Sequence, residues 1–263
     1  MALQPDNRFT TGATGWGRPA IADAAVVDAG LRAYMLRVYN WMASGLLLTG
    51  IIAFAIANNP DIQAMFWQVT RNAAGYRSIS PTVLGYVAMF SPIAFVLVLS
   101  FGINRLSATT AQALFWAYCA CMGASMSNIF LMYTGGSIAS TFFVTAGMFA
   151  ATSAYGYTTG RDLTKMGSFL MMGLIGLMLA MVINIFMQSP VMSFVISGIG
   201  VLLFVGLTAY DTQRIKADYI QFAYADGTEE AGKRGVMDAL TMYLNFVNLF
   251  QFLLQFMGVR NND

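Results

Sequence analysis

The sequence predicts an all-α polytopic membrane protein, and three observations lead to this fold class. The chain has 263 residues, of which 57% are hydrophobic and only 10% are charged, whereas charged residues make up about 25% of an average soluble protein. Seven apolar runs have the length of roughly 20 residues that an α-helix needs to cross a bilayer. A soluble globule with this composition would lack the polar residues that cover a surface in water.

The predicted spans follow one another along the chain. The links at 134–137 and 188–190 are so short that spans three and four, and spans five and six, are expected to form antiparallel helical hairpins. Residues 1–37 are polar and rich in glycine, and we expect them to form a mobile cytosolic tail. Residues 259–263 form a short C-terminal tail. The membrane domain covers residues 38–258, with spans at 38–57, 83–101, 111–133, 138–157, 167–187, 190–210 and 236–258.

The distribution of basic residues predicts the orientation in the membrane. If the N terminus is cytoplasmic, 11 of the 14 lysines and arginines lie on the cytoplasmic side. The other three, Arg71, Arg77 and Arg260, then lie outside. An excess of lysine and arginine in cytoplasmic loops is typical of membrane proteins. The pattern therefore favours an odd number of spans, with the N terminus in the cytoplasm and the C terminus outside.

The composition also excludes several classes of function. The chain contains no histidine, which rules out a Ser-His-Asp triad, a histidine zinc site and a histidine-ligated haem. Cys119 and Cys121 stand two residues apart in an apolar run, and we interpret them as small packing residues. The net charge of +2 is scattered and does not indicate nucleic-acid binding. We therefore expect neither an enzyme nor a resident cofactor.

Two carboxyl groups fall at the inner ends of predicted spans, whereas the other acids lie in tails and loops. Asp211 ends span six, and Asp238 begins span seven. A carboxylate inside a membrane is costly unless it is paired or hydrated, so both are functional candidates. Asp211 is either an interfacial acid held by Arg214 and Lys216, or an ion- or proton-binding group facing the bundle interior. Burial and a neighbouring arginine shift the pKa of a carboxyl group in opposite directions, so the sequence leaves its protonation open.

The last predicted span carries a polar stripe. Asp238 and Asn245 are seven residues apart and share one helix face, with Tyr243 and Asn248 close to it. A helix with such a stripe faces protein or water rather than lipid, so we expect span seven to be the central helix of the bundle. Hydrogen bonds between packed helices explain the stripe equally well.

Five segments of the chain resemble the Bax inhibitor-1 family, also called the transmembrane Bax inhibitor motif family, which includes bacterial YccA-like proteins. The segments occur in order and cover nearly everything from about residue 30 to the C terminus. They are LSFGINR at 99–105, SNIFLMYTGGSI at 127–138, YGYTTGRDL at 155–163, GLTAYDTQ at 206–213 and ALTMYLNFVNLF at 239–250. The resemblance implies a bacterial inner-membrane protein with seven helices, the last wrapped by the other six.

The resemblance also implies a function, a pH-modulated passive leak of calcium across the membrane. In the family, an aspartate on each of the last two helices forms the pH sensor, and an arginine near the end of the second helix takes part in gating. By motif, the first aspartate is Asp211, which would also contact the metal ion, and the arginine is Arg105. Calcium suits such a site because it prefers hard carboxylate and carbonyl oxygens.

The sequence departs from the family at the second aspartate, where it has Asn245. Two neighbouring carboxyl groups share a proton and titrate as a pair, and an Asp–Asn pair does not. The amide of Asn245 still offers hydrogen bonds to Asp211. Asp238, two turns away on the same face, is a candidate for the missing acid. The expected consequence is a weaker or less pH-sensitive leak, or a different role.

The different role that we consider is that of a membrane interaction protein without ion conduction of its own. Bacterial relatives are linked to a membrane protease of the FtsH type, as its substrate or modulator. A polar N-terminal tail suits recognition by a protease that needs a loose chain end. The expected partners are therefore the lipid bilayer and calcium, or the bilayer and a membrane protease.

Overall fold

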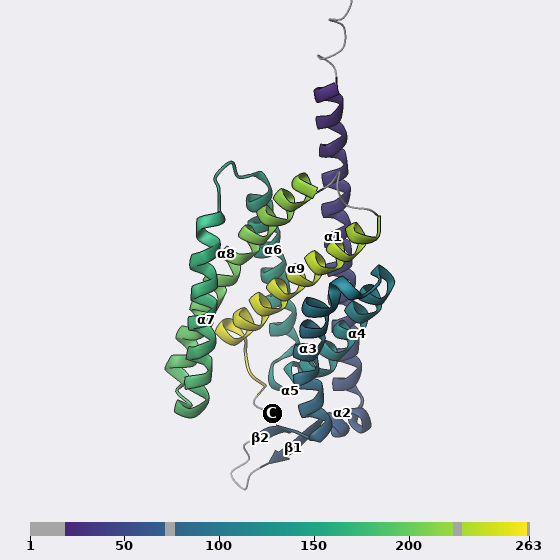
Figure 1. The fold of residues 1–263 in the computed structure, drawn as a ribbon. Coiled ribbons are helices and arrows are strands. Elements are labelled where there is room, and N and C mark those ends of the chain that lie inside the picture. The colour runs from purple at the N-terminus through teal and green to yellow at the C-terminus, as the bar shows by residue number, and fades with distance from the viewer. Residues whose placement is uncertain (1–18, 72–76, 223–227, 262–263) are drawn as a thin grey trace, which may run out of the picture.

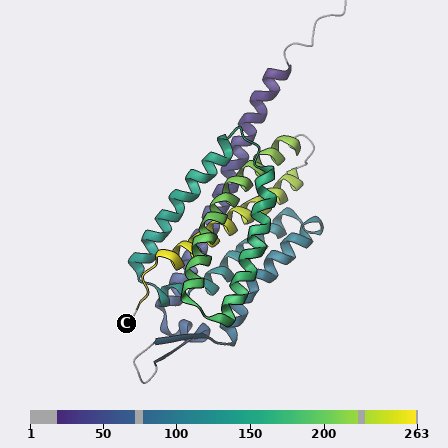
Figure 2. The same ribbon diagram turned by 90° about the vertical axis from the view of Figure 1, so that its left-hand side faces the viewer.

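A computed structural model describes residues 19–71, 77–222 and 228–261 of the chain. Seven helices in these residues are long and apolar enough to cross a membrane. Figures 1 and 2 show that they form one bundle. This confirms the predicted all-α polytopic class. The helices are α1 (Pro19–Asn58), α3 (Val83–Gly102), α4 (Ala108–Met126), α6 (Gly135–Thr158), α7 (Thr164–Met187), α8 (Pro190–Phe222) and α9 (Thr228–Met257).

Short elements cover one end of the bundle, and the sequence analysis predicts none of them. Two strands pair as an antiparallel ribbon, which lies at the same end as the C terminus (Figure 1). The buried Trp67 donates a hydrogen bond from Nε1 to Oγ of Ser127, 2.7 Å away, and so ties the ribbon to the end of α4. The elements at this end are α2 (Pro60–Phe66), β1 (Trp67–Arg71), β2 (Arg77–Pro81) and α5 (Ile129–Met132). The 3₁₀ turn η1 (Ile103–Arg105) joins α3 to α4 at the opposite end.

The first helix corrects the predicted boundary of the N-terminal tail. α1 begins at Pro19 rather than near residue 38. Its side chains at Leu31, Tyr34 and Met35 are buried against the rest of the bundle. The spacing of these residues places them on one stripe of a helix. The mean hydropathy of the segment hides this stripe, because the charged residues of the segment lower the mean. Residues 1–18 lie outside the described part, so the mobility of the tail stays a prediction.

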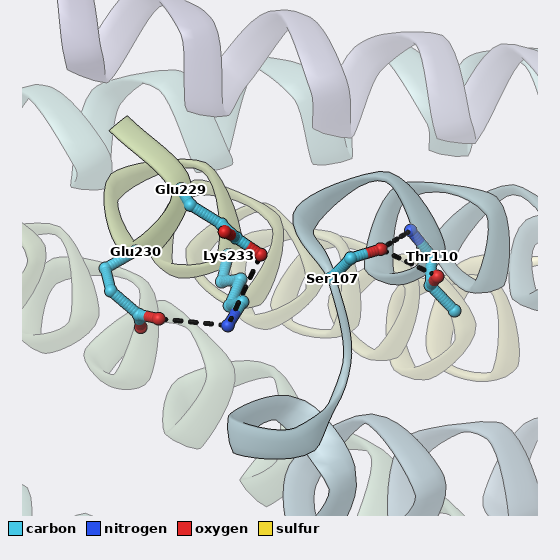
Figure 3. Close-up of polar contacts among 5 residues, drawn as sticks. All are labelled: Ser107, Thr110, Glu229, Glu230 and Lys233. Atoms are coloured by element: carbon cyan, nitrogen blue, oxygen red, sulfur yellow. Dashed lines mark hydrogen bonds and ion pairs between the residues drawn. The ribbon is translucent and has the colours of Figure 1, made fainter. Parts of the chain in front are cut away.

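The charged segment between the last two spans is also mostly helical, not a solvated loop. α8 continues to Phe222, and α9 begins at Thr228. In the first turns of α9, the buried Lys233 contacts Glu230 at 2.9 Å and Glu229 at 3.9 Å (Figure 3). These spacings of three and four residues bring side chains together only in a helix. The same figure shows the start of α4 beside this turn.

The last helix is the most deeply buried of the seven. Its most apolar window is 61% buried, and the next value, for α8, is 39%. α9 packs mainly against α1, α4, α6 and α8, whereas α3 packs mainly against α4, and α7 against α8. The central position predicted from the polar stripe therefore agrees with its burial. Wrapping by all six other helices, which the resemblance implies, is not confirmed.

A glycine brings α6 and α8 close together beside the candidate site. A Cβ atom on Gly156 would lie 2.2 Å from the backbone oxygen of Ala209. Only a residue without a side chain fits there, because small residues allow helix backbones to approach closely. The contact lies two residues before Asp211 on α8 and fixes α6 against this part of the helix.

Candidate functional site

Asp211 and Asn245, the pair predicted from the sequence, are in direct contact. Asp211 lies on α8 with only 6% of its surface exposed. The Nδ2 atom of Asn245, on α9, donates a hydrogen bond to Oδ2 of Asp211 at 2.7 Å. Nη2 of Arg214, one turn further along α8, lies 3.1 Å from Oδ1. The Oδ2 atom of Asp211 is therefore bound by an amide, and its Oδ1 atom is bound by a guanidinium.

The two basic residues predicted beside Asp211 behave differently. Arg214 forms the ion pair described above, whereas Lys216 turns to α6. Its Nζ atom donates a hydrogen bond to the backbone oxygen of Tyr157 at 2.9 Å and lies over the ring of the same residue. Arg214 alone of these two therefore neutralises the Asp211 carboxylate.

Arg214 holds Asp211 with a single arm. One of its terminal nitrogens makes the ion pair, while its Nε atom is buried and has no hydrogen-bond partner in the described part of the chain. The side chain is 40% exposed, compared with 9% for that of Asp211. A bidentate arginine–carboxylate pair is stronger and more rigid than a single contact, so Arg214 is less firmly held than a bidentate partner would be.

Asp238 makes a separate contact and does not join the Asp211–Asn245 pair. It lies on α9, seven residues before Asn245, which corresponds to about 10 Å along a helix. The hydroxyl of Tyr34, on α1, donates a hydrogen bond to its Oδ2 at 2.5 Å. Arg214 is close enough to act electrostatically on the carboxylates of both Asp211 and Asp238. The two acids are therefore related through one arginine, not through a shared proton.

Arg105 is not the arginine on Asp211. It ends the 3₁₀ turn η1 behind α3 and is exposed to the surface. α3 packs mainly against α4, whereas Asp211 lies on α8. Within the described residues, the guanidinium on Asp211 belongs to Arg214. The gating role that the resemblance assigns to Arg105 has no support in these contacts and stays a prediction.

The sequence predicts neither the contact of Tyr34 nor a chain of three hydroxyl groups beside Asp211. Tyr34 falls in the segment interpreted as a tail, although its spacing from Leu31 and Val38 marks a buried stripe. A chain of hydroxyl groups begins next to Asp211. Thr212 lies 3.0 Å from the hydroxyl of Ser153 on α6, which in turn hydrogen-bonds the hydroxyl of Tyr39 on α1. This chain links α8, α6 and α1.

The described side chains around Asp211 offer few ligands for a metal ion. Calcium in proteins takes six to eight oxygen ligands. No group of three or more His, Cys, Asp or Glu side chains is placed to hold a metal within the described ranges. Asp211 offers one carboxylate, and Asn245 adds one amide oxygen. A cation at Asp211 would therefore keep much of its hydration.

The whole membrane bundle has relatives of known family. A family model described as "Inhibitor of apoptosis-promoting Bax1" matches residues 31–262. The chain belongs to the Bax inhibitor-1 family. The match begins where the buried stripe of α1 begins. The predicted resemblance is thereby confirmed.

Similar members of this family occur in several bacteria. An uncharacterized protein of Caulobacter vibrioides is 44% identical over 248 residues, which is 93% of this chain and 96% of the relative. The inner membrane protein YbhL of Escherichia coli is 43% identical over 232 residues, 88% of this chain and 94% of that protein. An uncharacterized protein of Rickettsia prowazekii is 44% identical over 236 residues. These relatives match nearly the full bundle.

Proposed function

We propose that this member of the Bax inhibitor-1 family is a pH-modulated passive cation leak channel, with calcium as the transported ion. In this proposal Asp211 is the titrating carboxylate. The protein lies in a bacterial inner membrane, like its relative YbhL, with the N terminus in the cytoplasm and the C terminus outside. The observation that carries the proposal is a buried carboxylate inside a membrane-spanning bundle, held by one amide and one guanidinium. Acids in such positions mark ion and proton pathways.

Arg214 and a cation compete for the same carboxylate. With Arg214 in place the charge of Asp211 is neutralised, so an entering cation must displace the guanidinium. Displacement is feasible because Arg214 makes one ion pair within the described residues and its side chain is 40% exposed, so it can turn towards water. The arrangement thus supports a closed resting state in which the Arg214 guanidinium occupies the cation-binding carboxylate. We call this guanidinium the latch.

Protonation of Asp211 acts on the same latch. A proton removes the charge that attracts both Arg214 and the cation. Since the chain has no histidine, pH sensing between about pH 5 and 8 falls on carboxyl groups. Asn245 cannot take up a second proton, so we expect a titration with the slope of a single site rather than that of a coupled pair.

Calcium flux into vesicles tests the proposal. Purified protein is reconstituted into vesicles that contain a calcium-sensitive dye, and the leak is measured between about pH 5 and 8. We expect a leak above that of empty vesicles whose size changes with pH. The D211N substitution is expected to remove most of the pH dependence. Wild-type protein without flux at every pH would overturn the proposal.

Asp162 supplies the matched control. It lies in the turn between α6 and α7 and is fully exposed, and hydrogen bonds from Thr164 lower its pKa. It therefore stays ionised over the tested range. D162N makes the same chemical change as D211N outside the bundle, and we expect its pH profile to match that of the wild type. If D162N and D211N behave alike, Asp211 is not the sensor.

A further inference from the structure

α1 and α6 form the two walls of a groove whose floor is α9. Two cavities follow one another along it, one of about 600 Å³ and one of about 310 Å³. Phe246, on α9, lines both cavities. α1 and α6 both pack against α9, which crosses α6 towards α1 in Figure 1. Both cavities are partly open at the surface of the bundle.

The groove has the length of a membrane span. Its α1 wall runs from Arg32 to Ala53, and its α6 wall runs in the opposite direction, from Gly135 to Thr158. The α1 wall corresponds to about 32 Å of helix, and the hydrocarbon core of a bilayer is about 30 Å thick. In a membrane the groove therefore opens onto acyl chains along most of its length.

The two ends of the groove differ in polarity. The larger cavity contains the Arg32 side chain and the hydroxyl-bearing Tyr39, Ser153 and Tyr157. The smaller cavity is lined almost wholly by apolar side chains, and the hydroxyl of Thr49 is taken up by contacts inside the bundle. A cation at one end and hydrocarbon at the other match a single acyl chain that carries an anionic headgroup.

The floor and walls of the groove touch the neighbours of the candidate site. Phe246 follows Asn245 on α9. The hydrogen bond between Tyr39 and Ser153 joins the two walls, and Ser153 continues to Thr212, next to Asp211. An acyl chain in the groove would therefore contact Phe246, which is next to Asn245, and Ser153, whose partner Thr212 is next to Asp211.

We propose that the groove between α1 and α6 binds one acyl chain of an anionic phospholipid, with the headgroup at Arg32. The acyl chain lies over Phe246 and reaches into the smaller cavity. The headgroup phosphate pairs with the Arg32 guanidinium, which is exposed at the polar end. This site is independent of the proposed leak, because it requires no ion conduction.

Photocrosslinking with lipid probes tests the acyl-chain site. Purified full-length protein is placed in phosphatidylcholine vesicles with a trace of phosphatidylglycerol that carries a diazirine in one acyl chain. Crosslinked peptides are then mapped by mass spectrometry. We expect crosslinks concentrated on the groove-lining segments of α1 and α6. A146F fills the larger cavity, and we expect it to lower the yield of crosslinks to the groove severalfold. We expect the same loss for A150F, because Ala150 also lines this cavity.

Gly147 is the matched control for these variants. It is the next residue of α6, but a side chain added there meets open space. G147F is therefore expected to leave the crosslinks unchanged. Equal yields in A146F and G147F, or crosslinks spread evenly over the lipid-facing helices, would overturn the site.

Arg32 and Arg37 separate the headgroup contact from general attraction. Both lie on α1, but Arg37 lines a different cavity. One arginine near the membrane surface favours anionic over neutral lipid by about fivefold. The preference is measured by comparing the phosphatidylglycerol probe with a phosphatidylcholine probe that carries the same diazirine. We expect R32Q to lose this preference at the groove and R37Q to keep it. A preference unchanged in R32Q contradicts the headgroup assignment.

Discussion

The coupling between Asp211 and Asn245 can be measured by a double-mutant cycle. D211A, N245A and the double variant are compared with the wild type by denaturant unfolding in detergent. The hydrogen bond joins a buried carboxylate to an amide at 2.7 Å, and bonds to charged groups contribute about 1.5–3 kcal/mol. We therefore expect a coupling free energy of about 1.5–3 kcal/mol.

The cycle removes the contribution of Arg214. Both D211A and the double variant leave this arginine without its carboxylate, so the effect occurs twice and cancels in the coupling. Asn184 provides the control. Its side chain hydrogen-bonds Ser193, which is 18 residues, or about 27 Å, before Asp211 on α8. The free energies of D211A and N184A should add within about 0.5 kcal/mol. If the coupling between Asp211 and Asn245 is also below about 0.5 kcal/mol, their hydrogen bond makes no net contribution to stability and the reasoning is refuted.

Three further outcomes follow from the packing of the bundle. Y34F removes the hydroxyl that Asp238 accepts from and should lower the free energy of unfolding by about 1–3 kcal/mol, measured as for the cycle. G156A places a methyl group against the α8 backbone and should cost about 1–3 kcal/mol or more, whereas G147A meets open space and should be neutral or stabilising; equal losses contradict the close contact. Deletion of residues 2–18 should leave calcium flux intact. If it abolishes capture of an FtsH-type protease, the interaction maps to the tail, and no capture with either chain removes that alternative.

Features that depend on one helix and its periodicity are predictable from this sequence. The seven spans follow from apolar length, whereas the contact between Asp211 and Asn245 joins two helices and is indicated only by the family motifs. Features that depend on packing between distant segments are not. The prediction places Tyr34 in a tail, because the mean hydropathy of that segment hides the apolar stripe to which Tyr34 belongs. Its hydrogen-bond partner, Asp238, lies 204 residues away in the sequence. The gating role of Arg105 comes from a family motif. Its distance from Asp211 becomes evident only from the structure, in which α3 packs mainly against α4.

The burial of α9 has a consequence for how the protein is made. The most deeply buried of the described spanning helices is synthesised after α1 to α8. At about 5–20 residues per second, synthesis of its 30 residues takes about 1.5 to 6 s. During that interval Asp211 has no Asn245, and Tyr34 has no Asp238. Until α9 packs against the bundle, Oδ2 of Asp211 and the hydroxyl of Tyr34 therefore lack their partners, although Arg214 on the same helix can already contact Oδ1.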